Sequence, residues 1–274
     1  MAWLSADDDF HALHAGLTVD MIATPRKDFA CCGIGEILLD VVKRNVDKFD
    51  FMPVVKDQHD CQNEPILGIV SLSEYFHSAA PDEAVSERTR ALHEQHLIGS
   101  DASILAFILN ADRMPIRFLV AEEGIVGLVS LSDLQKLPVR AALFGLVTGL
   151  EIAMSDLIQQ AHPDRKDWEQ FMSRKRRDNL ETQIQKGKEA EGIVDPLLYT
   201  QFCDKRDILK KSVFHKNPER KEFNRALERI ESLRNDLAHA NGYATDTHQA
   251  ASVCATVRQL LEVYRKIVDF RSKT

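Results

Sequence analysis

A cation, an amide and an imidazole lie within six consecutive residues near the end of the sequence, at Arg234, Asn235 and His239. On a helix, Asn235 and His239 are four residues apart and share a face. Arg234 lies about 140° from His239 around the same helix, but its long side chain can reach over. An imidazole can move a proton near neutral pH, and a planar guanidinium fits phosphate oxygens. The pattern predicts chemistry on a phosphate, although these residue types also complement the dipole at a helix C-terminus.

Glu151 is a second candidate for this chemistry. It directly follows Ala141–Leu150, the most apolar stretch of the chain, which Arg140 precedes. A carboxylate there lies either at the edge of a buried face or near a functional site. Periodicity leaves both interpretations open.

The first half of the sequence contains an internal repeat. Gly-Ile-Val-Ser-Leu-Ser-Glu at residues 68–74 returns as Gly-Leu-Val-Ser-Leu-Ser-Asp at residues 127–133. Ser71 with Glu74, and Ser130 with Asp133, have the spacing of a helix start, where both side chains satisfy free N–H groups. Capping is therefore one interpretation of these residues, and ligand binding is the other.

Each repeat predicts the same elements in the same order. A helical stretch (35–46; 102–111) precedes an apolar strand (52–55; 115–120), and a turn leads to a second strand (67–70; 126–129) and then a helix. Met52-Pro53 is echoed by Met114-Pro115, 62 residues later, whereas the motif repeats at 59. We therefore expect three extra residues in the first turn, within the polar segment 58–65.

The second half predicts only helices. Pro138 suits a first helical turn, and an amphipathic pattern continues to about residue 160. A highly charged segment, 162–194, follows, then helices over about 196–214, from Asn217-Pro218 to about 240, and from Asp246 to about 270. Gly145 and Gly149 share a face of the first helix and leave a notch for close packing.

Charge divides the chain in the same place. Residues 1–137 contain 11 basic and 22 acidic residues, and residues 138–274 contain 24 and 20, so the second half suits an anionic partner better. Five cysteines without C-x-x-C spacing argue against a disulfide framework or a zinc site and fit a reducing cytosol. The N-terminal MAWLSADDDF lacks the pattern of a signal peptide, and ten uncharged residues cannot span a bilayer. We expect a cytoplasmic protein with no membrane partner.

The doubled motif resembles that of a CBS-domain pair over roughly residues 16–137, with units at about 16–78 and 95–137. Val19-Asp20-Met21-Ile22-Ala23-Thr24-Pro25 is similar to the entry segment of such domains. The resemblance implies clefts for adenosine compounds such as AMP, ADP, ATP or S-adenosylmethionine. Glu74 and Asp133 would hold the ribose, and Ser71 and Ser130 would lie near the phosphates. Asp133 is closer to the family pattern than Glu74. CBS pairs that bind no ligand are also common.

The string Arg-Asn-x-x-x-His, between two long helices of an all-helical half, resembles the HEPN signature over residues 138–274. This resemblance implies a homodimer and a metal-independent endoribonuclease. Arg234 and His239 would be the catalytic pair, Asn235 a supporting polar group and Glu151 an acidic partner from the first helix. HEPN domains that only bind RNA or dimerise are also known.

The sequence therefore predicts an α+β protein with an N-terminal extension (1–15), a CBS pair (16–137) and a HEPN-like helical bundle (138–274). The leading hypothesis is a nucleotide-gated ribonuclease of a stress or defence response, with no cofactor or metal in catalysis. One alternative is a non-catalytic nucleotide sensor whose helical half dimerises or binds RNA or a protein. Another is a toxin-like ribonuclease with the CBS pair as a scaffold. Metalloprotease, NTPase and α/β-hydrolase functions have no motif support.

Overall fold

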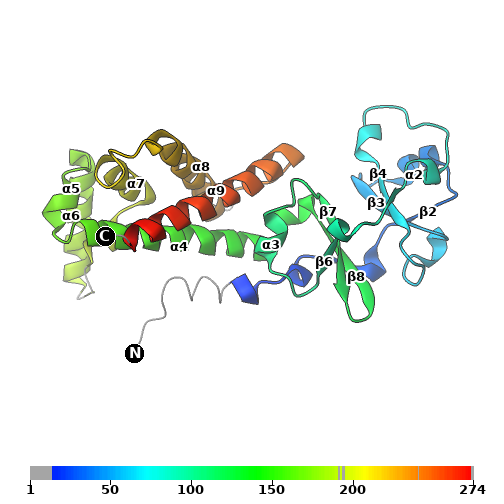
Figure 1. The fold of residues 1–274 in the computed structure, drawn as a ribbon, viewed down its shortest axis with the longest axis horizontal. Helices are drawn as coiled ribbons and strands as arrows, with labels where there is room; N and C mark the ends of the chain where they lie inside the picture. The colour runs from blue at the N-terminus through cyan, green and yellow to red at the C-terminus, as the bar shows by residue number, and fades with distance from the viewer. Residues whose placement is uncertain (1–13, 191, 193–194, 240, 273–274) are drawn as a thin grey trace. The chain divides into compact units, whose positions relative to one another are not determined.

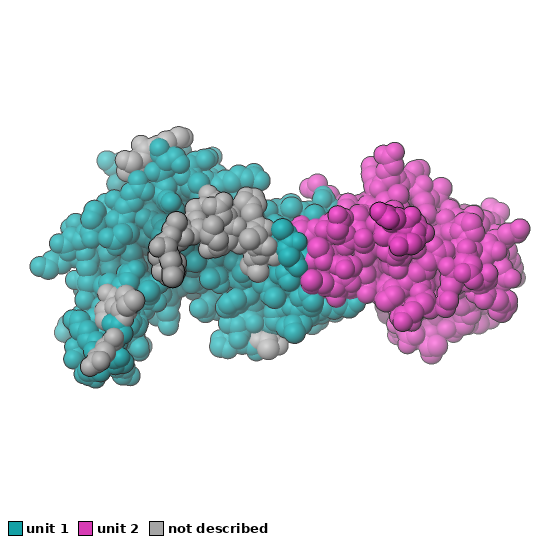
Figure 2. Space-filling view, turned by 90° about the horizontal axis from the view of Figure 1, so that it is seen from below, with its two compact units in different colours: residues 1–17, 104–112, 134–274 teal, residues 18–103, 113–133 magenta. Residues whose placement is uncertain are grey.

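The computed structural model describes residues 14–190, 192, 195–239 and 241–272, and these fold as two compact units (Figure 2). One is a mixed unit of residues 18–103 and 113–133. The other is a helical unit of residues 104–112 and 134–274, joined by the end of the N-terminal segment. Most of the predicted extension 1–15, with MAWLSADDDF, lies outside the described residues. An α+β chain with a helical second half is thus confirmed.

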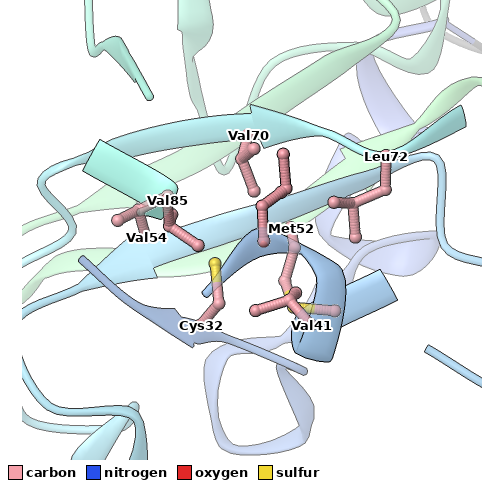
Figure 3. Packing of buried hydrophobic residues seen from close by; sticks show 8 residues of the cluster. Cys32, Val41, Met52, Val54, Val70, Leu72 and Val85 are labelled. Atoms are coloured by element: carbon pink, nitrogen blue, oxygen red, sulfur yellow. The ribbon is translucent and has the colours of Figure 1, made fainter. Parts of the chain in front are cut away.

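The first repeat forms a four-stranded sheet with the order β2-β3-β4-β5. Its strands are β2 (Cys32–Gly33), β3 (Phe51–Val55), β4 (Gly68–Ser71) and β5 (Arg90–Ala91). The β2–β3 pair is parallel and the other two pairs are antiparallel. Helix α2 (Leu38–Arg44) is shorter than the predicted helix over 35–46. It buries Leu38 and Val41 in the cluster that covers the sheet, and Figure 3 shows Val41 in this position.

The second repeat forms an equivalent sheet with the order β1-β8-β7-β6. Its strands are β1 (Thr24–Pro25), β8 (Gly124–Ser130), β7 (Ile116–Ala121) and β6 (Leu97–Gly99) (Figure 1). Here too the first pair, β6–β7, is parallel and β7–β8 is antiparallel. The two repeats therefore adopt the same pairing, as the doubled motif predicted.

The strand register corrects the predicted insertion. Val54 pairs with Gly68 in the first sheet, and Leu119 pairs with Gly127 in the second. Thirteen residues separate the first pair and seven the second, so the first loop is six residues longer, not three. The Met-Pro echo misled the sequence alignment because Met52 lies inside β3, whereas residues 114 and 115 precede β7.

The Ser-x-Ser-acid segments open 3₁₀ turns instead of the predicted α-helices. The first forms η4 (Ser73–Tyr75), and the second forms η7 (Leu131–Gln135). Other 3₁₀ turns of this unit are η1 (Val19–Met21), η2 (Arg26–Asp28), η3 (Gln58–Asp60), η5 (Val85–Glu87) and η6 (Glu94–His96). The second segment ends where the extended Lys136 becomes the N-cap of the following helix, in which Pro138 occupies the first turn.

The helical unit is a bundle of helices, as predicted, and α4 contacts most of the other long helices. Its elements are α4 (Leu137–Ala161), α5 (Arg165–Glu169), α6 (Arg174–Glu189), η8 (Pro196–Tyr199), α7 (Phe202–Lys211), α8 (Arg220–Ala238) and α9 (Thr247–Arg271). Helix α4 packs against α7, α8 and α9 (Figure 1). Its buried residues recur at helical spacing, from Val139 to Ile158. Asp246 caps α9 through the N–H of Gln249, as its spacing predicted.

Two helix boundaries differ from the prediction. The segment predicted as one helix over 196–214 breaks at Thr200, and the carboxylate of Asp204 accepts from the N–H of Gln201 to start α7. Asn217 is not the N-cap of the next helix. Its side chain accepts from the N–H of Glu219 at 2.8 Å, and α8 begins two residues later than the asparagine-proline pair suggested. The predicted end of α8, at residue 240, lies outside the described residues.

The short helix α3 (Ile104–Ile108) packs in the helical unit, although the predicted boundary placed it with the second repeat. Two contacts explain this position. Ile104, Phe107 and Ile108 are fully buried, and α3 contacts α4. Arg258 of α9 also forms an ion pair with Asp112 at 2.6 Å. Apolar cover and a charge-assisted contact therefore both hold residues 104–112 in this unit.

By length and composition alone, helix α4 could cross a membrane, because its 25 residues extend well beyond the ten uncharged residues, 141–150, on which the sequence argument was based. Half of its most apolar window is buried inside the protein. A core helix of a water-soluble bundle has the same properties, so this is weak support for a membrane span.

One disulfide corrects the expectation drawn from the cysteines. Cys31 and Cys61 are bonded, with 6.0 Å between their Cα atoms, and Cys32, Cys203 and Cys254 are free. An odd count excludes complete pairing but not a single pair. The partners are 30 residues apart and meet only because the long loop after β3 folds back.

Candidate functional sites

A cavity of about 130 Å³ lies in the mixed unit, where both repeats contribute to its walls. Its apolar wall consists of Phe51, Ile69, Met114, Pro115 and Ile116. Its polar groups are Ser71, Arg90, His96 and Arg113. A typical ligand pocket measures roughly 300–1,000 Å³, so this cavity would enclose only part of a nucleotide-sized molecule.

The polar side of the cavity is basic. The side chains of Arg90 and Arg113 make no hydrogen bond or ion pair with any residue in the described part of the chain. Both are exposed, and His96 lies half-buried beside them. Two arginines without protein partners next to an apolar wall suit a ligand that has an anionic and an apolar part.

The ring of His96 is held in one orientation. Its Nδ1 accepts from the N–H of His93 at 3.0 Å, so the neutral ring has its proton on Nε2. Burial, with the nearby His93, Arg90 and Arg117, lowers the pKa of His96. The free protein at neutral pH therefore presents an uncharged ring with its Nε2–H as the donor. An anionic ligand would favour the protonated ring, which gives up the hydrogen bond from the N–H of His93.

The structure separates the motif residues into two groups. Ser71 lines the cavity, and Glu74 is exposed outside its lining. In the second repeat, the N–H of Ser130 donates to Asp133 Oδ2 at 2.6 Å and its hydroxyl lies 3.2 Å from the same oxygen. Asp133 is buried and performs the capping role that the sequence left open. Ligand roles for these four residues remain predictions.

In the helical unit, the structure brings Glu151 of α4 beside Arg234 of α8. Glu151 Oε1 lies 3.4 Å from Arg234 Nε, and both side chains are only partly exposed. Arg234 Nη1 is also 3.4 Å from Asn235 Oδ1. The predicted acidic partner of the arginine is therefore its ion-pair partner in the structure.

His239 lies apart from this pair. It is the exposed C-cap of α8, and its N–H donates to the carbonyl of Asn235 at 3.0 Å. Within the described residues, no hydrogen bond or ion pair joins its ring to Arg234 or Glu151. One chain thus supplies the predicted catalytic groups without assembling all of them.

Lys205 of α7 completes the polar cluster around Glu151. Only 4% of this lysine is exposed, and its Nζ donates to the carbonyl of Thr200 at 2.9 Å. Burial lowers its pKa, whereas the charge of Glu151 raises it. Glu151 therefore has two cationic neighbours, the partly exposed Arg234 and the buried Lys205.

Arg140 of α4 fixes the end of α8 that precedes His239. Its guanidinium donates to the carbonyls of Asp236 and Leu237 at 3.1 and 3.0 Å, and to that of Asn241 at 2.7 Å. It also lies 4.9 Å from the ring centre of Tyr243. These contacts satisfy carbonyls that a helix C-terminus leaves free and so position the motif.

A second cavity, of about 370 Å³, borders α8 and α9 next to this end. Its polar lining includes the carboxylate of Asp236 together with Arg229, Ser232, His248, Ser252 and Thr256. Hydroxyl and basic groups of this kind can donate to phosphate or sugar oxygens.

Sequence reasoning missed the residues that surround the candidate groups. Arg90, His96 and Arg113 lie outside the repeated motif, so no pattern marked them. Lys205 had a detectable signal, because it lies three residues after Phe202 and three before Ile208, both buried. A lysine on the apolar face of an amphipathic helix indicates a buried charge with a specific partner.

No protein-family model matches the chain, and no curated protein matches it in sequence. Among solved structures, it is similar to the CBS domain of a bacterial CNNM/CorC family Mg²⁺ transporter in complex with ATP (17% identity, TM-score 0.38, 50% of this chain and 94% of that chain). It is also similar to a hemolysin-like protein containing a CBS domain from Oenococcus oeni PSU (12%, 0.35, 48% and 96%). A third similar structure is a hexameric CBS-CP12 protein from bloom-forming cyanobacteria (14%, 0.34, 81% and 97%). At TM-scores below 0.5, none of these likenesses assigns a fold or a function to this chain.

Proposed function

We propose that the mixed unit is a CBS-type sensor that binds an adenine nucleotide. The observation that supports this most is the cavity in which Ser71 lies beside Arg90, His96 and Arg113, against an apolar wall. The wall suits the base or sugar, and the basic groups suit the phosphates. Calorimetry of the full chain with AMP, ADP, ATP and S-adenosylmethionine tests the proposal. If none of the four binds, the unit acts as a scaffold.

The helical unit is, in this proposal, a metal-independent endoribonuclease regulated by that sensor. RNA provides its own nucleophile. The 2′-oxygen attacks the phosphorus, the bond to the 5′-oxygen breaks, and a 2′,3′-cyclic phosphate and a 5′-hydroxyl form. His239 would transfer a proton to or from these oxygens, and Arg234 would stabilise the charge that develops on the phosphate.

The Glu151–Arg234 ion pair sets a condition on this mechanism. Arg234 must exchange part of its contact with Glu151 for the phosphate, while Asn235 and the exposed His239 face the incoming RNA. Lys205, behind Glu151, would compensate that carboxylate when Arg234 turns to the substrate. Incubating the purified protein with total RNA, with and without EDTA, tests the activity. Products with cyclic phosphate ends in both samples support it.

A homodimer is part of the same proposal. Leu137, Phe144 and Ile152 are exposed on α4 by 76%, 47% and 47%, and the notch of Gly145 and Gly149 lies between the last two. An uncharged face with small residues can pack against its own copy about a two-fold axis. A second chain would also bring a second His239. Light scattering should give twice the chain mass, and a monomer at micromolar concentration would contradict a composite site.

One observation favours a non-catalytic sensor as the second candidate. Arg234 is paired with Glu151, and no bond connects His239 to them in the described residues. A nucleotide-binding protein whose helical unit only dimerises or binds RNA would need no closer assembly. Binding of RNA without cleavage under all the conditions above would support this alternative.

A further inference from the structure

The disulfide between Cys31 and Cys61 ties the edge of the first sheet to the loop that follows β3. Cys31 directly precedes β2, and Cys61 directly follows η3, with 6.0 Å between the two Cα atoms. The bond therefore crosses from a buried strand end to a polar surface loop. In this position the disulfide restrains the surface loop relative to the sheet.

The second repeat forms the same sheet without this bond. Strand pairing places Leu97 where the first repeat has Cys31, because Cys32 pairs with Val54 as Ile98 pairs with Leu119. Cys61 lies within the longer loop of the first repeat, whose counterpart after β7 is a tight turn. The fold of a repeat thus does not require the disulfide, and its loss need not unfold the unit.

The disulfide and the cavity share one packed cluster. Cys31 belongs to the buried cluster that contains Ile69 and Ile116, and Cys61 and Phe51 pack against it. Phe51, Ile69 and Ile116 are also the wall of the cavity. Closely packed side chains transmit a displacement to their neighbours, so a change at Cys61 reaches the cavity wall directly.

The surroundings of the two sulfurs suit reversible chemistry. Cys61 is half-buried, so a small thiol or disulfide can reach it, whereas Cys31 is buried. The neighbouring Cys32 is unsuited to exchange, because burial raises the pKa of its thiol to about 12 and it points into the opposite cluster (Figure 3). Thiol exchange in this region is therefore confined to Cys31 and Cys61.

Other bonds keep the loop close to the sheet edge, without fixing all of it, when the disulfide is open. Arg26 Nη2 donates to the carbonyl of Glu64 at 2.6 Å, and Arg44 Nη2 donates to Gln58 Oε1 at 3.0 Å. These contacts keep the reduced Cys61 near Cys31 and favour closure again.

We propose that Cys31 and Cys61 form a redox switch that controls ligand binding in the cavity, an inference that rests on the proposed nucleotide function. The oxidant is a small-molecule disulfide such as oxidised glutathione. The Cys61 thiolate attacks it, forms a mixed disulfide and releases one thiol. The Cys31 thiolate then attacks the Cys61 sulfur and releases the second thiol. Two protein thiols lose two electrons and two protons, and the oxidant becomes two thiols.

The closed bond orders the cavity wall before the ligand arrives. A preorganised site loses less conformational freedom on binding, so the oxidised protein should bind the nucleotide more tightly. Opening the bond lets the long loop move and weakens binding without removing the contacts to Arg90 and Arg113.

The test uses the full chain after treatment with either reduced or oxidised glutathione. Peptide mass mapping should find Cys31 joined to Cys61 only after oxidation. Calorimetry with ATP should then show roughly threefold or tighter binding in the oxidised sample. The Cys61→Ser variant should bind equally in both samples, and Cys203→Ser, which changes a half-buried cysteine of the other unit, should behave like the natural chain.

Hydrogen exchange provides a readout that does not need a nucleotide. Amides of β3 and β4 should exchange more slowly in the oxidised sample, and this difference should vanish in Cys61→Ser. If exchange differs while AMP, ADP, ATP and S-adenosylmethionine all fail to bind either sample, the nucleotide function is refuted, and the disulfide is shown to control only the order of the cavity wall. The switch is refuted if oxidised glutathione leaves both thiols free, or if exchange and affinity match in the two redox states.

Discussion

The two candidate sites differ in what their arginines contact. Arg90 and Arg113 border the cavity of the mixed unit without a carboxylate partner in the described structure, whereas Arg234 is paired with Glu151 in the helical unit. Arginines without an ion-pair partner can bind an anionic ligand without losing another contact. An arginine that is already paired must first give up part of its ion pair. The mixed unit therefore resembles a site ready for a ligand, and the helical unit a site that requires a change to become active.

Substitution of His239 tests the helical side of this comparison and has the largest expected effect. Loss of a general acid or base typically lowers a rate by about 10² to 10⁴. We expect His239→Ala to reduce RNA cleavage by this factor, measured by gel assay, and Arg234→Lys to fail as well because an ammonium lacks the planar fork. His215→Ala, an exposed histidine of the same unit, is the control. Cleavage that survives His239→Ala, or that needs a divalent metal, would refute the mechanism.

Substitution of Arg113 tests the cavity. A hydrogen bond to a charged group contributes roughly 1.5–3 kcal/mol, so its loss should weaken nucleotide binding by about tenfold to a hundredfold. Calorimetry with Arg113→Ala measures this. Arg88→Ala removes an exposed arginine that does not line the cavity and should leave affinity unchanged. If the two variants bind alike, the basic side of the cavity is not the phosphate site.

Features that depend on local sequence could be predicted before the structure was known. Strand pairing and the positions of α4, α8 and α9 follow from hydrophobic periodicity and capping residues such as Asp246, which act locally. The Glu151–Arg234 pair could be anticipated because Glu151 interrupts an apolar pattern and Arg234 belongs to a recognisable string.

Features that depend on tertiary packing escaped prediction. Arg90, His96 and Arg113 meet only after two repeats pack together, and no spacing along the chain brings them into one pattern. The Cys31–Cys61 bond likewise depends on how a loop folds back. The Met-Pro echo shows the converse error, since identical residues at 52 and 114 occupy different places relative to the strands.

The pH dependence of nucleotide binding should identify the role of His96. Burial and nearby cations lower its pKa, so it is neutral in the free protein at pH 7. A bound phosphate favours the protonated ring and raises that pKa, which means that binding takes up a proton. Affinity should therefore increase as pH falls through the range below the ordinary histidine value of about 6.5, by up to about tenfold for each unit of pKa difference. His96→Gln should remove this component and leave only the titration of the phosphate. An unchanged profile would place His96 outside the binding site.

The two acidic residues of the repeated motif provide the finest test of the comparison. Asp133 is buried and accepts from the N–H of Ser130, whereas Glu74 is exposed. Loss of such a cap typically costs about 0.5–2 kcal/mol, so Asp133→Ala should lower the free energy of unfolding in urea by that amount and Glu74→Ala should have almost no effect.

The family resemblance also predicts that Asp133→Ala weakens nucleotide binding more than Glu74→Ala. Asp133→Asn separates the two roles, because its amide oxygen can still accept from Ser130 but its charge is gone. Weak binding in a stable Asp133→Asn protein would indicate that the carboxylate contacts the ligand. Normal binding in that variant would leave Asp133 a capping residue, with the cavity beside Ser71 as the site of ligand recognition.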